Sequence, residues 1–194
     1  MIVLYKPIVA LREMSVFVAM RKASLSMWGD AVIELATFST IVHSEVWVLE
    51  EAQQKQLAYA AFEDANPCFT QRVAPADSFD WVLLRIPVSV ENVPLAHSFL
   101  RDIRNAKLRY RIPWEWGCPQ FVLHELENDL DCNRPDTWGS VFCSQATLLF
   151  LRRCACANLI TVPTAPLFEA DSNGVSPAQL YRTLTRMGCE VVNA

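Results

Sequence analysis

Short hydrophobic runs in the first half of the chain predict β-strands. The segments A-V-I-E-L-A (31–36) and H-S-E-V-W-V-L (43–49) are rich in strand-forming residues, and they predict two strands able to pair as a hairpin. The run D-W-V-L-L-R-I-P-V (80–88) predicts a buried strand that ends at the proline. Residues 69–73 predict a short strand. The apolar stretches of 2–20 fit a strand or a short helix, and the periodicity of 57–63 also fits either.

Helical patterns dominate the second half. Residues 91–107 have the spacing of an amphipathic helix. Its predicted apolar face consists of Leu95, Phe99, Leu100 and Ile103. Another helix is expected at 119–130. Ser176 and Gln179 form a capping-box pattern for a last helix, which ends at Gly188, a residue type common just after a helix.

A further helix is predicted around Cys143, within W-G-S-V-F-C-S-Q-A-T-L-L-F-L-R-R (138–153). Ser140 is a residue type favoured at N-caps, and two arginines suit the C-terminal end, so we predict a helix that Ser140 caps. Cys143 would then lie in the first turn. Unpaired amides and the helix dipole stabilise a thiolate there and lower the thiol pKa from its usual ~8.5. From these residues alone, an inert cysteine buried in the core is the alternative.

Composition places the chain among globular proteins. Hydrophobic residues make up 52% of the 194 residues and charged residues 20%, which fits one domain, 1–194, with a sizeable core. The net charge of −4 and the lack of a long basic run argue against nucleic-acid binding. No apolar run reaches the ~18 residues that a membrane span needs, and the apolar N-terminus lacks a clean signal-peptide pattern. We therefore expect a soluble protein that is not exported.

The seven cysteines are irregularly spaced and include no C-x-x-C pair. A tetrahedral zinc site needs ligands at recognisable spacing, so neither a metal nor another cofactor is expected. Reduced thiols in an intracellular, cytoplasmic or virion-associated protein are the simplest interpretation, and a secreted protein with a disulfide is the alternative.

Three motifs carry a family resemblance: G-D-A-V-I (29–33), H-S-E-V-W-V (43–48) and F-C-S-Q (142–145). In this order they resemble the circularly permuted branch of the NlpC-type papain-like cysteine hydrolases, which includes the YiiX-like proteins and lecithin:retinol acyltransferase. That branch has a Gly-Asp before a strand, a histidine at the start of the next strand, and a later cysteine at a helix N-terminus. Gln145 departs from the pattern, because the family often has an acid there.

Three looser matches extend the resemblance to about residues 28–188. They are V-L-L-R-I-P (82–87), L-R-Y-R (108–111) and S-P-A-Q-L-Y (176–181). The resemblance implies an α+β fold of papain-like type in circularly permuted order. An antiparallel sheet would pack against a helix that carries the cysteine at its N-terminus.

The resemblance also implies roles for particular residues. Cys143 would be the nucleophile and His43 the base, and Glu63 resembles the acid that orients the histidine, with Asp64 as its close rival. The backbone amide of Cys143 and the hydroxyl of Tyr110 would stabilise the oxyanion. As alternatives, the two acids belong to a solvated turn and Tyr110 is a packing residue.

The other histidines and three of the tryptophans are expected to be structural. His97 and His124 fall in predicted helices, where a surface or core-edge position is the expectation. Trp114, Trp116 and Trp138 are expected in the core rather than beside a substrate.

These expectations lead to a thiol hydrolase that cleaves an amide or an ester through an acyl-enzyme. Its substrate would be a peptide, a cell-wall peptide or an acyl-lipid. One alternative is a lipid acyltransferase of the same branch. The other is a non-catalytic structural or interaction protein that retains the fold and binds an assembly partner, such as a virion component, since six tryptophans fit an interface as well as a core.

Overall fold

The computed structural model describes residues 15–23, 39–50, 55–62, 64–75, 80–110, 130–172 and 174–192. Several predicted features lie outside the described residues: the motif at 29–33, the strand at 31–36 with its hairpin, Glu63, Trp114, Trp116, and the helix at 119–130 with His124.

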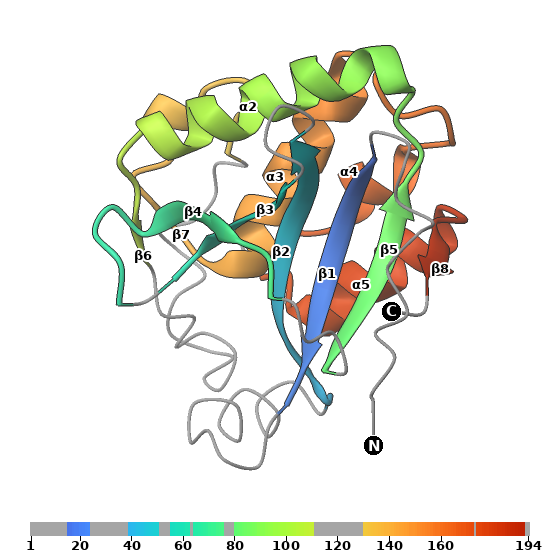
Figure 1. Ribbon diagram of the computed structural model, residues 1–194, viewed down its shortest axis with the longest axis horizontal. Coiled ribbons are helices and arrows are strands. Elements are labelled where there is room, and N and C mark those ends of the chain that lie inside the picture. Colours follow the sequence, from blue (N-terminus) through green and yellow to red (C-terminus); the bar gives the residue numbers. More distant parts are fainter. Residues whose placement is uncertain are drawn as a thin grey trace.

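The described part of the chain is built on a six-stranded antiparallel sheet (Figure 1) with the strand order β4-β3-β2-β1-β5-β8. The strands are β1 (Val16–Lys22), β2 (Ile41–Glu50), β3 (Lys55–Ala61), β4 (Phe69–Val73), β5 (Trp81–Ile86) and β8 (Glu190–Val192). The predicted strands at 43–49, 69–73 and 80–88 are confirmed. The ambiguous segment 57–63 is mostly strand, because β3 pairs with both β2 and β4.

Four α-helices accompany the sheet in the described residues: α2 (Val93–Asn105), α3 (Cys143–Cys156), α4 (Ala165–Glu169) and α5 (Pro177–Arg186). Short 3₁₀ turns η3 (Val90–Asn92) and η5 (Pro135–Thr137) precede α2 and α3, and β6 (Arg109–Tyr110) pairs in parallel with β7 (Ser140–Val141). Helix α3 packs on β2 and β3, α5 also contacts β2, and α2 packs on α3 (Figure 1). This arrangement is an α+β fold in which the helix that begins with Cys143 lies on the central strands.

Two helix predictions need correction. Ser140 does not cap α3: it lies in β7, and the N-cap is Phe142, whose side chain makes no capping hydrogen bond. Pairing with β6 keeps the backbone extended through Val141, so the helix starts later than the local sequence predicts. In α2 the buried stripe consists of Val93, Ala96, Leu100 and Ile103, and Leu95 is 45% exposed.

The last helix follows its sequence signals. The Ser176 hydroxyl accepts from the amide of Gln179, whose side chain in turn accepts from the amide of Ser176. Gly188, just after the end of α5, has a φ of 80°, a conformation that glycine adopts without steric cost.

Alternation along β2 separates its side chains between two apolar layers. Val46 and Val48 belong to the main core, which also contains the buried sides of α2, α3 and α5. Trp47 points to the opposite face, where it forms a smaller buried cluster with Phe17 and Trp81, among others. His43 and Glu45 share the face of Trp47 because they are four and two residues before it, respectively. None of the helices in the described ranges is long and apolar enough to cross a membrane.

Candidate active site

The N-terminus of α3 meets β2 where β2 separates from β3. The two strands pair only from Val46 to Glu50, so the preceding residues of β2 have β1 as their partner strand. The sulfur of Cys143 accepts hydrogen bonds from the backbone amides of Ser44 and Ser144. An amide on the open edge of β2 and an amide of the first helical turn therefore both point at the sulfur.

A second set of bonds fixes the start of α3 on β2. The hydroxyls of Ser44 and Thr147 lie 3.2 Å apart, and Thr147 Oγ1 donates to the carbonyl of Cys143 at 3.0 Å. On the next residue, the Ser144 hydroxyl donates to the carbonyl of Val175 at 2.7 Å. All of these side chains are buried, so the position of Cys143 is determined by packing and by hydrogen bonds on both sides.

The thiol of Cys143 and the ring of His43 form a hydrogen-bonded pair. Burial alone would raise the pKa of Cys143, which is only 3% exposed, but the charge and hydrogen bond of His43 together with the two amides lower it. Burial alone would lower the pKa of His43, but the Cys143 sulfur and Glu45 raise it to about 9. The opposite shifts favour a thiolate beside an imidazolium.

The other described cysteines with resolved shifts behave in the opposite way. Burial raises the pKa of Cys68, Cys132 and Cys189 to about 11, and it raises that of Cys154 still further. Cys143 is therefore distinguished by its partners rather than by its exposure, since Cys68 and Cys154 are buried to a similar degree.

Glu45 is the acid that contacts His43. Its Oε1 lies 3.2 Å from Nε2 of His43, and its Oε2 accepts from Nε1 of Trp47 at 2.8 Å. Arg72 of β4 completes the set by donating to Oε1 from its Nη2. Although burial would raise the pKa of this fully buried carboxyl, its bond and charge interaction with His43, the Trp47 indole and Arg72 lower it, so it stays ionised.

The position of Glu45 also indicates which ring nitrogen serves which partner. Because Nε2 faces the carboxylate, Nδ1 is the nitrogen left for the sulfur. Phe62 and Trp81 flank the ring, with centroid distances of 5.4 and 6.3 Å. The ring is therefore held by a carboxylate at one nitrogen and by aromatic side chains at its sides.

Sequence reasoning missed Glu45, although a signal was present. The pattern H-x-E-x-W on a predicted strand places His43, Glu45 and Trp47 on one face at adjacent positions. Glu63, the predicted acid, lies outside the described residues, and its rival Asp64 is exposed in a turn after β3.

Tyr110 lies on β6, the strand that pairs with the segment leading into α3. In the β6–β7 pair it is opposite Val141, two residues before Cys143. The backbone amide of Cys143 is the first of α3, and the first amides of a helix have no partner within it. Both predicted oxyanion donors thus belong to segments at the N-terminus of α3.

Other sequence candidates take structural positions. His97 lies at the junction of α2 and β3, where its Nε2 is 2.6 Å from the hydroxyl of the buried Tyr59. Trp138 is buried and donates from Nε1 to the carbonyl of Asp131. Within the described ranges, no three His, Cys, Asp or Glu residues cluster as a metal ion would require.

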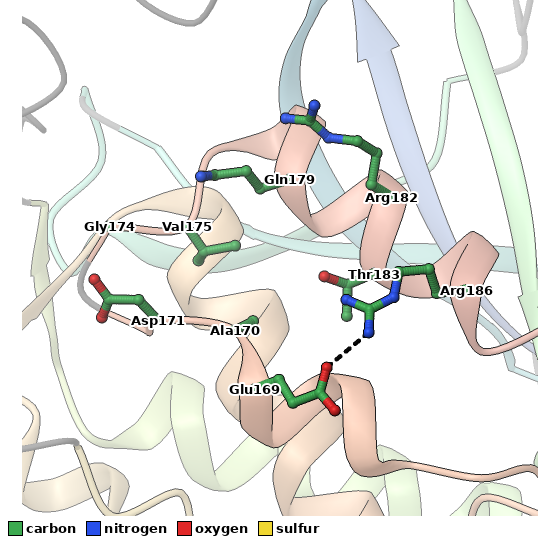
Figure 2. Close-up of a pocket in the computed structure, with 9 residues that line it drawn as sticks. All are labelled: Glu169, Ala170, Asp171, Gly174, Val175, Gln179, Arg182, Thr183 and Arg186. Atoms are coloured by element: carbon green, nitrogen blue, oxygen red, sulfur yellow. Dashed lines mark hydrogen bonds and ion pairs between the residues drawn. The ribbon is translucent and has the colours of Figure 1, made fainter.

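A hollow of about 390 Å³ lies between α4 and α5 (Figure 2). Figure 2 shows Glu169, at the end of α4, reaching Arg186 of α5, with an oxygen–nitrogen distance of 2.7 Å. Neither Cys143 nor His43 lines this hollow, although Val175, on its edge, accepts the Ser144 bond described above.

Comparison of the chain with protein-family models, with curated proteins and with solved structures gives no match.

Proposed function

We propose that this protein is a cysteine hydrolase that cleaves an amide or ester bond through an acyl-enzyme, on a papain-like fold in circularly permuted order. The observation that carries the proposal is the buried Cys143–His43 pair, with the pKa of the thiol lowered and that of the imidazole raised to about 9. A structural cysteine has no need of a charged imidazole, whereas a nucleophile needs both a thiolate and a proton donor nearby.

The order of elements supports the permuted arrangement. The strand with His43 precedes the helix with Cys143, the helix packs on that strand, and the thiol lies at the helix N-terminus. This is the order and placement that the sequence motifs of the permuted papain-like branch imply.

In the first half of the reaction, the thiolate of Cys143 attacks the substrate carbonyl carbon. The negative charge that develops on the carbonyl oxygen is stabilised by the backbone amide of Cys143 and the hydroxyl of Tyr110. His43 then gives its proton to the departing amine or alcohol, which leaves the acyl group on the sulfur.

In the second half, neutral His43 takes a proton from water, and the resulting hydroxide attacks the thioester. The acid is released and the thiolate–imidazolium pair is restored. Glu45 is the positioning residue in both halves: it holds Nε2, and its charge favours the imidazolium. We therefore assign Glu45 the orienting role that the family resemblance implied for Glu63.

The test is acylation by p-nitrophenyl esters of short and long fatty acids. We expect a burst of p-nitrophenol and one acyl group per chain, located on Cys143 by mass spectrometry. Cys143→Ala should abolish both signals, and Cys189→Ser should keep them, because Cys189 is a buried thiol with a raised pKa. Release of free acid indicates a hydrolase, and transfer to an added amine or alcohol indicates an acyltransferase.

The proposal fails if Cys143 is not acylated, or if iodoacetamide modifies it no faster than the other cysteines. That result would favour the interaction-protein alternative.

A further inference from the structure

A pair of cysteines lies at the end of α3 opposite to Cys143. The sulfurs of Cys132 and Cys156 are 3.9 Å apart, and both residues are free thiols. Cys156 is the last residue of α3, and Cys132 belongs to the turn that precedes η5. A disulfide has a sulfur–sulfur distance of about 2.0 Å, so the two sulfurs must come about 2 Å closer to form one.

The turn that carries Cys132 is fixed independently of the sulfur contact. The carbonyl of Asp131 accepts from Trp138 Nε1 at 2.8 Å and from the amide of Arg134 at 3.0 Å. Its side chain accepts from the amide of Asn133 at 2.9 Å. Because both backbones are held in place, the two thiols meet at a high effective concentration.

The two thiols differ in access. Cys156 is exposed, whereas Cys132 is 8% exposed. Burial and the neighbouring Cys156 raise the pKa of Cys132 to about 11, so its thiol is a poor first nucleophile. Cys154, two residues before Cys156, is buried in the main core and its pKa is raised further still. Cys156 is therefore the thiol that an oxidant in solution reaches first.

We propose that Cys132 and Cys156 are a redox-sensitive pair that forms a disulfide by exchange with a small-molecule disulfide such as oxidised glutathione. The Cys156 thiolate attacks one sulfur of the oxidant, breaks its S–S bond and releases one thiolate. Cys132, as its proton leaves to solvent, attacks Cys156 in the mixed disulfide and releases the second. Two protein thiols are oxidised, one small-molecule disulfide is reduced to two thiols, and the electrons balance.

The bond would close a loop that contains Cys143. The loop runs from Cys132 through η5 and β7 to the end of α3. The disulfide would therefore join the segment that precedes Cys143 to the C-terminal end of α3. A cross-link of about 25 residues removes conformational entropy from the unfolded chain, and we expect the melting temperature to rise by about 5–10 °C. The inference does not depend on the proposed hydrolase activity.

The experiment incubates the reduced full-length protein with oxidised glutathione, then maps cross-linked peptides by tandem mass spectrometry and measures melting temperature. We expect a Cys132–Cys156 cross-link and a higher melting temperature, both reversed by dithiothreitol. Cys156→Ser should abolish both effects without unfolding the protein, because the side chain is exposed, and Cys189→Ser should retain both. A Cys143→Ala background removes the proposed nucleophile as a competing site for glutathione.

Two outcomes would overturn the proposed pair, and a third would overturn the stabilising role of its bond. Cys156 could carry only a glutathione adduct, Cys132 could be linked to Cys154 instead, or the cross-linked protein could melt at the temperature of the reduced protein. The first two exclude the pair, and the third excludes a stabilising role for the bond.

Discussion

Replacing Glu45 by Gln tests whether the acid on β2 sets the charge state of the site. Glutamine keeps the size of the side chain but loses the charge and one of its two acceptor oxygens. In the wild type, one carboxylate oxygen accepts from Trp47 and the other faces His43. A glutamine side chain has only one oxygen, so its NH₂ group must face either Trp47 or His43. The imidazolium of His43 therefore loses one of its two charged partners and keeps the Cys143 sulfur.

The size of the effect follows from the geometry. An opposite charge within ~4–6 Å shifts a pKa by roughly 1–3 units, and Arg72 shares this carboxylate, so we expect the lower part of that range. The apparent pKa of His43, about 9 in the wild type, should fall by about 1–2 units. That fall corresponds to about 1.4–2.7 kcal/mol less stabilisation of the imidazolium.

The assay is the rate of Cys143 alkylation by iodoacetamide as a function of pH, which requires no known substrate. The wild type should show one step at low pH, where the thiolate–imidazolium pair forms, and an upper step near pH 9, where His43 loses its proton. In Glu45→Gln the upper step should lie about 1–2 units lower. Glu190→Gln is the matched control, because Glu190 is an exposed acid of β8 whose ion-pair partner is Arg85.

An upper step that stays near pH 9 in Glu45→Gln would refute this reasoning. If Glu63→Gln moves the step instead, the orienting acid is Glu63, as the family resemblance implied. A melting curve for each variant separates an altered charge state from a damaged fold.

Three other predictions concern the reactivity of Cys143, the helix caps and the acid stability of the fold. His43→Gln should slow alkylation of Cys143 at pH 6 by roughly 10-fold or more, measured by mass spectrometry, because without the imidazolium a buried thiol is protonated at that pH. Ser176→Ala should lower the free energy of unfolding by about 1 kcal/mol, whereas Ser140→Ala should leave it almost unchanged, because Ser176 caps a helix and Ser140 does not. Equal effects of the two substitutions would contradict the start of α3 described above. The folded protein lowers the pKa of Glu45, so the unfolded chain binds its proton first and stability should fall as the pH drops below about 4.5. The free energy of unfolding, measured with denaturant at a series of pH values, should fall less steeply with decreasing pH in Glu45→Gln than in the wild type. If it falls equally steeply in both, the pKa of Glu45 is the same in the folded and unfolded protein.

Much of the fold could be predicted locally. The strands at 43–49 and 69–73, the amphipathic α2 and the capped α5 depend on residues two to four positions apart, which short-range patterns record. The position of Cys143 in the first turn of a helix also followed from its neighbours, even though the predicted cap was wrong. The phase of α2 was misjudged because packing on α3 selects Val93 and Ala96 rather than Leu95 as buried positions.

The sequence alone determined the alternation of β2, and with it that His43, Glu45 and Trp47 share a face. Only the tertiary structure decided that Glu45 is an ionised partner of His43. Burial opposes the charge of Glu45, His43 and then Arg72 from another strand favour it, and the sulfur that charges His43 reaches the site on a distant helix. The same holds for Ser140, whose local preference for capping loses to pairing with β6. Charge states and strand pairings arise from groups far apart in the chain, whereas periodicity and capping record only neighbours, so the site is completed by the fold.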